Sequence, residues 1–427
     1  MLNIPNSGKK RIVIIGGGFA GIKLAEELNN EDYQVILIDK NNYHQFQPLF
    51  YQVATAGIEP SGILFPLRKL FHRHRDFYLR ITEVTSVDCE RKEVHTKSGS
   101  CNYDYLVIAA GAETSYFGLE NIQRVAYPMK SVTEALSLRN GILKNLERAL
   151  FEVDIRRKEE LMNLVVVGGG PTGTEVAGAL AEMKKHIFPK EYKELDIAKI
   201  RIVLIEASPS LLGGMSHRSS AKSERYLKKL GVEVLTGVQV KDYQNNSVIL
   251  SNGDAIPTQT VIWAAGIKGT NLEGIPAEVY TPGGRIKVDA FNRADGIDSL
   301  FAIGDNCVMV SDALPKGHPQ VAQVAIQQAR NLGRNFKLLL QKREMIPFRY
   351  KNLGSMATVG RHLAVADLPG VTLFGFFAWY VWMFVHLMSI LGVKNRLFVF
   401  LNWLWSYFTF DQSLRLIIKR DAGGEED

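Results

Sequence analysis

Two stretches of the chain, residues 11–39 and 164–206, repeat one pattern of hydrophobic and polar positions. Each begins with a β-branched apolar run (RIVII and LVVV), passes through a glycine-rich turn (GGGFAG and GGGPTG) and an amphipathic helical segment, and ends in a second apolar run that closes on a carboxylate. Strands that are apolar at successive positions are buried on both faces, as in parallel sheets. The pattern therefore predicts two βαβ units.

Each unit is followed by a matching apolar phrase, YDYLVIAAGAET at residues 103–114 and TQTVIWAAGIKG at residues 258–269. The repeat thus extends over whole domains and predicts two dinucleotide-binding domains. Further along, SLFAIGDN (residues 299–306) predicts a strand that ends at Gly304 and Asp305, and residues 320–336 predict a helix. The expected fold class is therefore α/β, with two Rossmann-like domains.

The composition shifts from about residue 346 toward aromatic and apolar residues. Residues 373–392 and 397–410 contain no Asp, Glu, Lys or Arg, and four of the five tryptophans lie in this part. About 20 apolar residues suffice to span a bilayer, whereas Trp and Tyr favour its interface. Composition leaves three interpretations open: one membrane span, two helices lying on the surface, or a buried dimer interface. It favours a membrane-facing role, with Lys394 and Arg396 at headgroup level and with Arg415 and Lys419 as further cations for anionic lipid.

The remaining composition excludes several classes of protein. The chain has 427 residues, 46% of them hydrophobic, and a net charge of +7, values that suit two or three globular domains rather than a disordered chain or a nucleic-acid binder. Its three cysteines form no CxxC pair, which argues against a disulfide framework, an iron–sulfur cluster or a zinc site. We expect no metal. The N-terminal segment MLNIPNSGKK has no apolar signal core.

Gly16, Gly18 and Gly21 form the first GxGxxG turn. At this spacing the glycines permit a tight turn, the close approach of a pyrophosphate and close helix–strand packing, while the helix N-terminus supplies amide donors for the phosphates. Asp39, at the end of the next strand, is placed to accept hydrogen bonds from both hydroxyls of an adenosine ribose. A turn that serves packing alone is the alternative, and the complete strand–turn–helix–strand–acid order favours the nucleotide.

Gly168, Gly170 and Gly173 repeat this turn, and Glu206 repeats the acid after a longer insertion. One turn for each nucleotide implies two bound nucleotides. Because a carboxylate repels a 2′-phosphate, Glu206 predicts NADH rather than NADPH at the second site.

Four further residues have two interpretations each. Glu175, in the first turn of the second helix, is either a helix-dipole residue or faces a nicotinamide and a flavin ring. Asp305 is either a bare strand-end residue or binds a ribityl hydroxyl. Gln323 and Gln327, spaced i, i+4, share one helix face that is either solvated or open to a flat ring. The aromatic and amide-rich segment 42–59 either walls the flavin or fills a core.

The combination resembles the type II NADH:quinone oxidoreductases, also called alternative NADH dehydrogenases. The resemblance covers nearly the whole chain and rests on GGGFAG, HQFQPLFYQVATAGIEP, GGGPTGTEVAG, IVLIEASPSLL, AIGDN, AQVAIQQ and NRLFVFLNWLWSYFTFDQSLRLI. It implies FAD in the first domain, NADH in the second, and ubiquinone or menaquinone reached through a channel near the AQxxxQ helix. It also implies C-terminal helices that lie in one leaflet without crossing it.

The resemblance also implies a set of site residues. The predicted FAD residues are Gly16, Gly18, Phe19, Ala20, Gly21, Asp39, Lys40, Ala110, Gly111, Gly304, Asp305 and Gln323. The predicted NADH residues are Gly168, Gly170, Pro171, Thr172, Gly173, Glu175, Glu206, Ala265 and Gly266. Glu175, as the acid beside the nicotinamide, and the quinone-site glutamines Gln323 and Gln327 form the predicted catalytic set.

The implied organisation is an FAD-binding domain (residues 9–125 and 288–345), an NADH-binding domain (126–287) and a C-terminal membrane-association module (346–427). Hydride passes from NADH to FAD, and two electrons pass from FAD to a membrane quinone, without proton pumping. We expect a homodimer, bound to the lipid surface on the cytoplasmic face of the inner membrane, with no nucleic-acid partner. The alternatives are a soluble NAD(P)H-dependent reductase of ferredoxin or rubredoxin and an NADH-sensing flavoprotein without quinone turnover.

Overall fold

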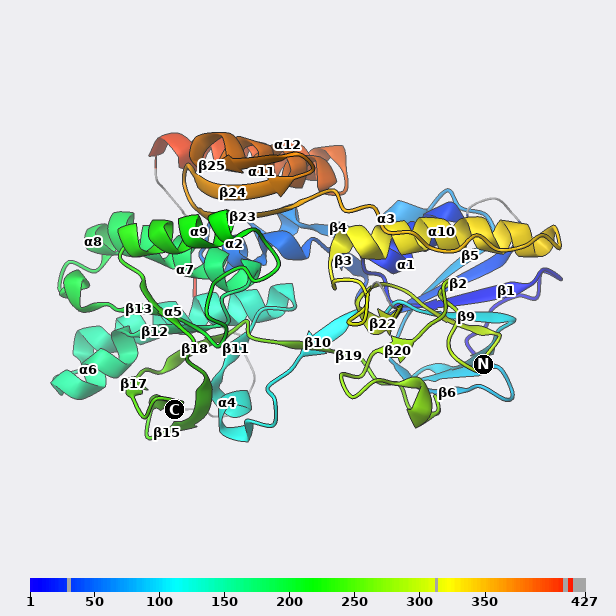
Figure 1. Cartoon of the computed structure of the whole chain (residues 1–427), viewed down its shortest axis with the longest axis horizontal. Coiled ribbons are helices and arrows are strands. Elements are labelled where there is room, and N and C mark those ends of the chain that lie inside the picture. Colours follow the sequence, from blue (N-terminus) through cyan, green and yellow to red (C-terminus); the bar gives the residue numbers. More distant parts are fainter. Residues whose placement is uncertain (29–31, 312–313, 410–413, 418–427) are drawn as a thin grey trace. The chain divides into compact units, whose positions relative to one another are not determined.

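The structure, a computed structural model, describes residues 1–28, 32–311, 314–409 and 414–417 (Figure 1). The chain forms two compact units, each assembled from separate stretches of sequence. Unit 1 comprises residues 1–45, 65–113 and 267–353, and unit 2 comprises residues 46–64, 114–266 and 354–427. Strands β4 (Leu64–Pro66) and β10 (Ala112–Thr114) each run across a boundary between the units.

Unit 1 is built from short strands and three helices among its described residues. In chain order these are β1 (Arg11–Ile15), α1 (Phe19–Glu27), β2 (Gln34–Asp39), β3 (Tyr43–Gln45), α3 (Leu67–Phe71), β5 (Phe77–Ile81), β6 (Val84–Asp88), β7 (Glu93–Thr96), β8 (Gly99–Asn102), β9 (Tyr105–Ile108), β19 (Ile267–Gly269), β20 (Ile286–Lys287), β21 (Leu300–Ala302), β22 (Cys307–Val308) and α10 (Ala322–Leu340). The central sheet is parallel, with the order β21-β9-β1-β2-β5. The strand order reverses at β1, so the carboxyl ends of β1 and β9 border the crevice where such sheets bind ligands.

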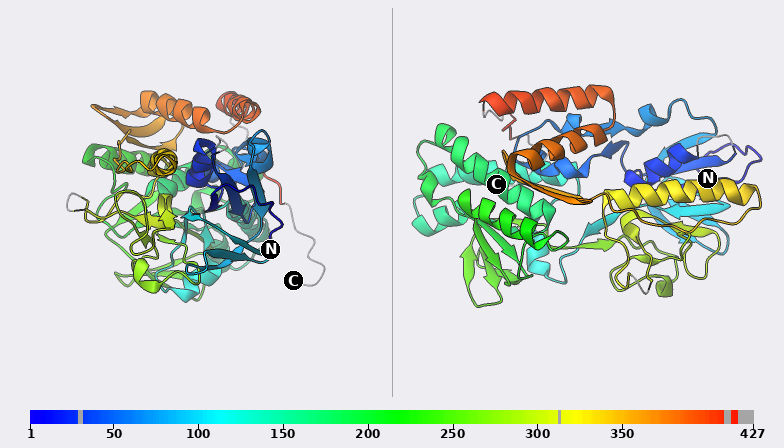
Figure 2. Two further views of the ribbon diagram at one scale, coloured as in Figure 1. Left: turned by 90° about the vertical axis from the view of Figure 1, so that its right-hand side faces the viewer. Right: turned by 45° about the horizontal axis from the view of Figure 1, so that its top comes forward.

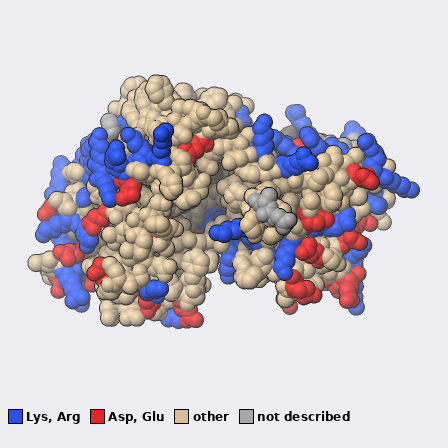
Figure 3. Space-filling view, in the orientation of Figure 1, with Lys and Arg blue, Asp and Glu red and all other residues tan. Residues whose placement is uncertain are grey.

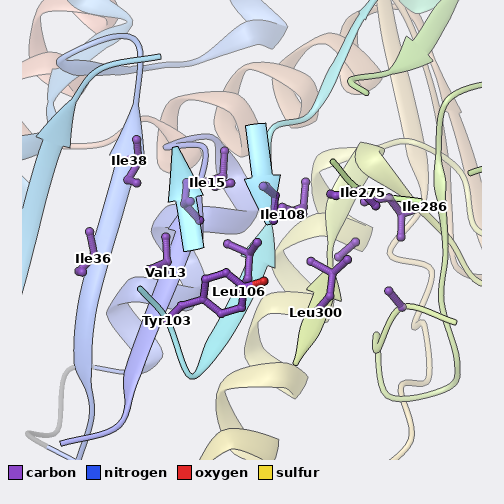
Figure 4. Packing of buried hydrophobic residues seen from close by; sticks show 14 of the residues in the cluster. Val13, Ile15, Ile36, Ile38, Tyr103, Leu106, Ile108, Ile275, Ile286 and Leu300 are labelled. Atoms are coloured by element: carbon purple, nitrogen blue, oxygen red, sulfur yellow. The ribbon is translucent and has the colours of Figure 1, made fainter. Parts of the chain in front are cut away.

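One hydrophobic cluster of unit 1 lies on one face of this sheet. Val13, Ile36, Leu106 and Leu300, one from each of four neighbouring strands, are fully buried. Figure 4 shows these side chains gathered from β1, β2, β9 and β21. Burying each such side chain contributes about 1.5–3 kcal/mol, so the unbroken apolar runs seen in the sequence place these strands inside the sheet.

Unit 2 repeats the arrangement. Its first part contains, in chain order, α2 (Phe50–Ala54), α4 (Glu120–Val125), β11 (Tyr127–Pro128), α5 (Val132–Phe151), α6 (Ile155–Met162), β12 (Leu164–Val167), α7 (Pro171–His186), α8 (Phe188–Glu191), β13 (Ile202–Glu206), α9 (His217–Lys229), β14 (Glu233–Thr236), β15 (Val240–Gln244), β16 (Ser247–Leu250), β17 (Ala255–Pro257) and β18 (Thr260–Trp263). The parallel sheet has the order β11-β18-β12-β13-β14, in which β12 takes the central place that β1 has in unit 1. The predicted pair of Rossmann-like sheets is confirmed.

The C-terminal part of unit 2 adds elements that the sequence did not predict in full. β23 (Ser355–Gly360), β24 (Leu363–Leu368) and β25 (Val371–Phe374) form an antiparallel sheet, followed by the expected helices α11 (Gly375–Ser389) and α12 (Val393–Thr409). Figure 2 shows α11 and α12 next to each other. Within the described ranges, no helix is both long enough and apolar enough to cross a membrane.

Residues 46–64 pack with these C-terminal elements. The indole N–H of Trp403 donates a hydrogen bond to the side-chain oxygen of Gln52 (2.7 Å), and the Asn395 amide donates to the carbonyl of Leu64 (2.8 Å). α2 also packs against α5 and α7. The two units therefore follow the packing contacts of the chain, whereas the predicted domains follow the nucleotide that each stretch of sequence is expected to bind.

α7 and β23 approach so closely that no side chain fits between them. A Cβ on Gly178 would lie 1.7 Å from the carbonyl oxygen of Val359. This contact sets the distance between the nucleotide-binding part of unit 2 and the C-terminal sheet, so Gly178 is needed for packing.

We expect Gly178→Ala to lower the melting temperature. Alanine is the better helix former by about 1 kcal/mol, but its methyl group would have to displace a backbone carbonyl, and overpacking typically costs about 1–3 kcal/mol. The clash therefore dominates. Gly213→Ala is the control, because no described atom lies within 4 Å of a Cβ there. Thermal unfolding of both variants checks this, and a Gly178→Ala protein as stable as wild type would contradict the contact.

Candidate active site

The first glycine-rich turn joins β1 to α1 and lies against the end of β9. Gly16 has a φ of +107°, and a Cβ there would lie 2.3 Å from the carbonyl oxygen of Ala109. A Cβ on Gly21 would lie 1.8 Å from the carbonyl oxygen of Gly16. Any other residue would push α1 away from the sheet, so both glycines are dictated by the fold.

The second turn, between β12 and α7, has nearly the same contacts. Gly168 has a φ of +106°, and its Cβ would lie 2.5 Å from the carbonyl oxygen of Ala264. The Cβ of a residue at Gly173 would lie 1.8 Å from the carbonyl oxygen of Gly168. The internal repeat seen in the sequence is therefore a repeat of backbone geometry.

The middle glycine of each turn, Gly18 or Gly170, is not required by a close backbone contact. No described atom lies within 4 Å of a Cβ built on Gly18 or Gly170. α1 begins at Phe19 and α7 at Pro171, and no described side chain caps either helix. Backbone amides next to open space at a helix N-terminus suit the pyrophosphate of a dinucleotide. The residues present therefore fit FAD at the first turn and NADH at the second.

Asp39 and Glu206 occupy equivalent places at the ends of β2 and β13. The Asp39 carboxylate accepts a hydrogen bond from the N–H of Gly17 (2.5 Å), and Glu206 accepts one from the N–H of Gly169 (2.6 Å). Asp39 also accepts a hydrogen bond from the N–H of Asn41 (2.6 Å), and Glu206 accepts one from the N–H of Ser208 (2.7 Å). Burial raises the pKa of Asp39, while its two N–H donors lower it. Both acids are thus held beside their turns, as a ribose-binding carboxylate requires.

Gly304 and Asp305 follow β21, as predicted, and begin a short 3-10 helix. Gly304 has a φ of +74°, and its N–H donates to the side-chain oxygen of Gln328 (2.8 Å). The Gln328 amide also donates to the sulfur of Cys307 (3.4 Å), and the side chain is fully buried. Gln328 is not among the predicted site residues, because it lies on another face of α10 than Gln323 and Gln327. Its position shows that it holds the loop that carries Asp305.

Gln323 and Gln327 share one face of α10, and both contact the chain segment that follows this helix. Gln327 exchanges two hydrogen bonds with the backbone of Lys351 (2.9 and 3.0 Å). The side-chain oxygen of Gln323 accepts hydrogen bonds from the N–H of Leu353 (3.1 Å) and the hydroxyl of Tyr350 (3.3 Å). The pair thus anchors this segment, a contact that their i, i+4 spacing did not predict.

Glu175 lines a cavity of about 110 Å³ that lies entirely within unit 2. Three parts of the unit form its wall: α2 with the turn after it, α7, and the C-terminal sheet and helices. Its lining residues include Tyr51, Gln52, Thr55, Glu175, Ala179, Glu182, Thr358, Arg361, Trp379, Trp382, Trp403 and Tyr407. The cavity therefore combines two carboxyl groups with aromatic rings, the mixture of a ligand pocket.

The environment of Glu175 favours its neutral form. The side chain is 8% exposed, and its carboxyl accepts one long hydrogen bond from the N–H of Thr358 (3.4 Å). Burial raises the pKa of Glu175 to about 8, although the Thr358 N–H and the Trp382 indole lower it. Burial also raises the pKa of Tyr51, and the charge of Glu175 adds to this effect. Glu175 consequently holds a proton near neutral pH, which suits a general acid.

Polar and aromatic contacts order the rest of the wall. The amide of Gln52, which accepts the Trp403 indole N–H, donates to the hydroxyl of Tyr51 (2.8 Å). Trp382 stacks on His386 with ring centroids 4.1 Å apart, and burial lowers the pKa of His386 to about 4, which keeps it neutral. In segment 42–59, Phe50, Val53 and Ala54 fill a core, as one of the two interpretations predicted, whereas Tyr51, Gln52 and Thr55 line the cavity; that the segment walls the flavin stays a prediction.

The other predicted residues lie at strand ends or helix starts. No described atom lies within 4 Å of a Cβ on Gly111, but at Gly266 the ring of Phe117 would lie 2.3 Å from it. Phe117 has a φ of +53° and is 67% exposed, and no sequence signal singled it out. Phe19, Ala20, Pro171 and Thr172 are the first residues of α1 and α7, and Lys40, Ala110, Ala265 and Gly266 follow the ends of β2, β9 and β18.

Comparisons with known proteins agree with this geometry. Residues 10–329 match the family described as pyridine nucleotide-disulphide oxidoreductase, and residues 352–409 match the NDH2 C-terminal domain. The type II NADH:quinone oxidoreductase Ndh of Mycobacterium tuberculosis is 35% identical over 94% of this chain and 89% of its own length. The internal alternative NAD(P)H-ubiquinone oxidoreductase A1 of Arabidopsis thaliana is 29% identical over 93% of this chain and 84% of its own.

Solved structures show the same fold. NDH2 of Plasmodium falciparum in complex with NADH has a TM-score of 0.88 and 24% identity, covering 96% of this chain and all of its own. The sulfide:quinone oxidoreductase of Aquifex aeolicus has a TM-score of 0.71 and 21% identity. The two glycine turns, each with its carboxylate, define a two-dinucleotide flavoprotein of the pyridine nucleotide-disulphide oxidoreductase class. Within that class, the chain belongs to the family of type II NADH:quinone oxidoreductases.

The raised pKa of Glu175 predicts a pH dependence of stability that Glu175→Gln removes. The folded-state pKa of about 8 lies above the ordinary value of 4.5, so folding favours the protonated carboxyl. The free energy of unfolding is therefore highest below pH 4.5 as far as this group is concerned, and it falls as the pH rises from 4.5 to 8. In that window wild type should lose on the order of 1.4 kcal/mol per pH unit relative to the variant. Melting curves of the FAD-loaded proteins from acid to mildly alkaline pH measure this.

Glu194→Gln, a change of an exposed glutamate on the same unit, is the matched control and should follow wild type at every pH. Parallel curves for Glu175→Gln and wild type would show that Glu175 titrates as an ordinary carboxyl.

Proposed function

We propose that the quinone is reduced in the cavity of unit 2, beside Glu175, and that it enters from a membrane surface. The observation that carries this proposal is the position of a buried, proton-bearing carboxyl in a cavity whose opposite wall is built from the C-terminal helices. A quinone needs an apolar ring site and protons in addition to electrons, and this cavity offers the first two together.

The protein oxidises NADH and reduces a quinone with FAD as cofactor, the activity of the family to which it belongs. When bound, FAD takes the electron pair of NADH and passes it to the quinone. The chain's own residues hold the two dinucleotides, orient the rings and supply protons. Family membership therefore favours this enzyme over a soluble ferredoxin or rubredoxin reductase and over a sensor flavoprotein without turnover.

Glu175 gives a proton to the quinone oxygen in this proposal, instead of serving only the nicotinamide or the helix dipole. A carboxylic acid with a pKa of about 8 keeps its proton at neutral pH in the resting enzyme and can release it to a stronger base. Gln323 and Gln327 remain proposed quinone-side residues, and their contacts with the segment after α10 support a positioning role.

The membrane contact is proposed for α11 and α12. Figure 3 shows that the surface over these helices carries almost no Lys, Arg, Asp or Glu. Exposed large apolar side chains on them include Phe376, Phe377, Phe384, Met388, Val393, Leu397, Phe398, Phe400, Leu401, Leu404, Trp405 and Phe408. Apolar patches of this extent mark interaction surfaces, and aromatic rings favour a lipid interface. We propose binding in one leaflet, on the cytoplasmic face of the inner membrane, by a homodimer.

The predicted lipid-facing cations have different surroundings. Lys394 lies over the ring of Phe398 (5.4 Å), and Arg396 donates to the carbonyl of Ile390 (2.8 Å) at the start of α12. Arg415 pairs with Glu191, so its charge is offset within the protein, and Lys419 lies outside the described residues.

We expect Glu206→Gln to raise activity with NADPH relative to NADH. The carboxylate that accepts the Gly169 N–H would repel a 2′-phosphate, and glutamine keeps one of the two acceptor oxygens without the charge. The wild-type preference for NADH should be on the order of 100-fold in kcat/KM and should narrow in the variant. Steady-state kinetics with both nucleotides measure the ratio, with unchanged FAD content as the control. Equal use of both nucleotides by wild type would contradict the role of Glu206.

The membrane proposal predicts that Phe377→Glu combined with Phe384→Glu releases the protein from liposomes. Both rings are exposed on α11 (72% and 67%), and placing two charges in the interface should lower partitioning by on the order of tenfold or more. Phe151→Glu, which changes an equally exposed ring on α5, is the control. Cosedimentation measures binding, and reduction of a water-soluble acceptor should persist. Undiminished liposome binding would refute α11 as the anchor.

A further inference from the structure

A second carboxyl group, Glu182, lines the same cavity as Glu175 and has no role in the reaction described so far. The two glutamates are spaced i, i+7 on α7, so they lie on one face of the helix two turns apart. Glu182 accepts a hydrogen bond from the backbone N–H of Arg361 (2.5 Å). Both glutamates therefore line one cavity from the same helix.

The volume between the two carboxyls suits water. A cavity of about 110 Å³ has room for several water molecules, each of which needs polar partners. The lining residues Glu175 and Glu182 offer carboxyl oxygens as such partners, and the Tyr51 hydroxyl, which accepts from the Gln52 amide, can also donate its own proton. Hydrogen-bonded water that joins two acids is a path along which protons move.

The surroundings of the two carboxyls differ in access. Glu175 is 8% exposed, whereas Glu182 is partly exposed and lies three residues before the exposed Lys185 on α7. The Arg361 guanidinium donates to the carbonyls of Ser406 and Tyr407 at the end of α12. Glu182 is therefore the more accessible end of the cavity and Glu175 the more buried end.

The ionisable groups that face Glu182 come from four elements. They are Lys185 and Glu175 on α7, Arg361 in the turn after β23, Tyr51 on α2 and Tyr407 on α12, while α11 contributes Trp379, Trp382 and Met383, which do not titrate. Burial raises the pKa of Glu182, whereas the Arg361 N–H and the charges of Arg361 and Lys185 lower it.

We propose that Glu182 is a proton-relay residue, which returns a proton to Glu175 through cavity water after each quinol forms. The inference rests on the proposed function, in which Glu175 donates to the quinone. Reduction of a quinone to a quinol takes two electrons and two protons. NADH supplies both electrons and one proton as a hydride, and the second proton comes from Glu175. Glu175 gives up one proton and becomes a carboxylate; a proton from Glu182 then restores it, and Glu182 takes one from solvent. No residue of the relay changes its oxidation state.

A purely structural role is the alternative, because Glu182 also holds the turn after β23. A Cβ on Gly360 would lie 2.9 Å from the Glu182 carboxyl oxygen, so this turn packs directly on the side chain. Glu182→Gln keeps the shape and the acceptor for the Arg361 N–H but holds no exchangeable acid proton. Glu182→Asp keeps the acid on a shorter side chain.

The experiment compares single and multiple turnovers of the membrane-bound holoenzyme with a long-chain quinone. In Glu182→Gln the first quinone reduction should keep the wild-type rate, since Glu175 is already protonated. Later turnovers should slow by on the order of tenfold or more, increasingly at high pH, and should recover when a small diffusible acid is added. Glu182→Asp should retain most of the rate.

Infrared difference spectra give a readout that does not depend on rate. Reduction by NADH followed by quinone should perturb two protonated carboxyl bands in wild type and one in Glu182→Gln. Equal slowing of first and later turnovers without rescue, or no slowing at all, would overturn the relay. Glu175→Gln tests the proposed function separately, because a normal first turnover in that variant refutes proton donation by Glu175. A slow first turnover in Glu175→Gln together with normal later turnovers in Glu182→Gln refutes only the relay.

Discussion

The packing of α7 against β23 at Gly178 is the contact on which unit 2 depends. Because the helix backbone meets the Val359 carbonyl without a side chain between them, the C-terminal sheet lies directly on the nucleotide-binding part of the unit. The same helix starts at the second glycine turn and carries Glu175 and Glu182 along one face. One element thus holds a phosphate-binding N-terminus at its start and an acid-lined cavity along its length, and a shift of α7 would disturb both.

Much of the fold was predictable from the sequence, because its signals are local. Buried parallel strands, glycine turns and strand-end acids each occupy a few consecutive positions, and Gly16, Gly168, Asp39 and Glu206 were located in that way. The repeat added further support, since two independent copies of a weak motif are stronger than one. The C-terminal helices were also anticipated, although the three strands before them were not.

The cavity could not be predicted, because its wall joins residues that are far apart in sequence. Glu175 and Thr358 are separated by 183 positions, and Gln52 and Trp403 by 351. No periodicity links such positions. Glutamine Gln328 was missed for another reason: a buried amide that supports a loop has the same local pattern as one on a solvated helix face, and only the contact with Gly304 distinguishes them.

The likeness of the two glycine turns has a consequence for how the enzyme tells its dinucleotides apart. Their closest backbone contacts are almost the same, 2.3 and 2.5 Å for the first glycine and 1.8 Å in both turns for the last. Both dinucleotides contain a diphosphate, and the two turns present nearly the same backbone geometry to it. The turns alone therefore do not distinguish one dinucleotide from the other. The selectivity for FAD or NADH must then come from contacts with the other parts of each ligand, where unit 1 and unit 2 differ. Unit 2 adds the cavity lined by Glu175, Glu182 and aromatic rings, so its distinctive chemistry lies outside the repeated turn.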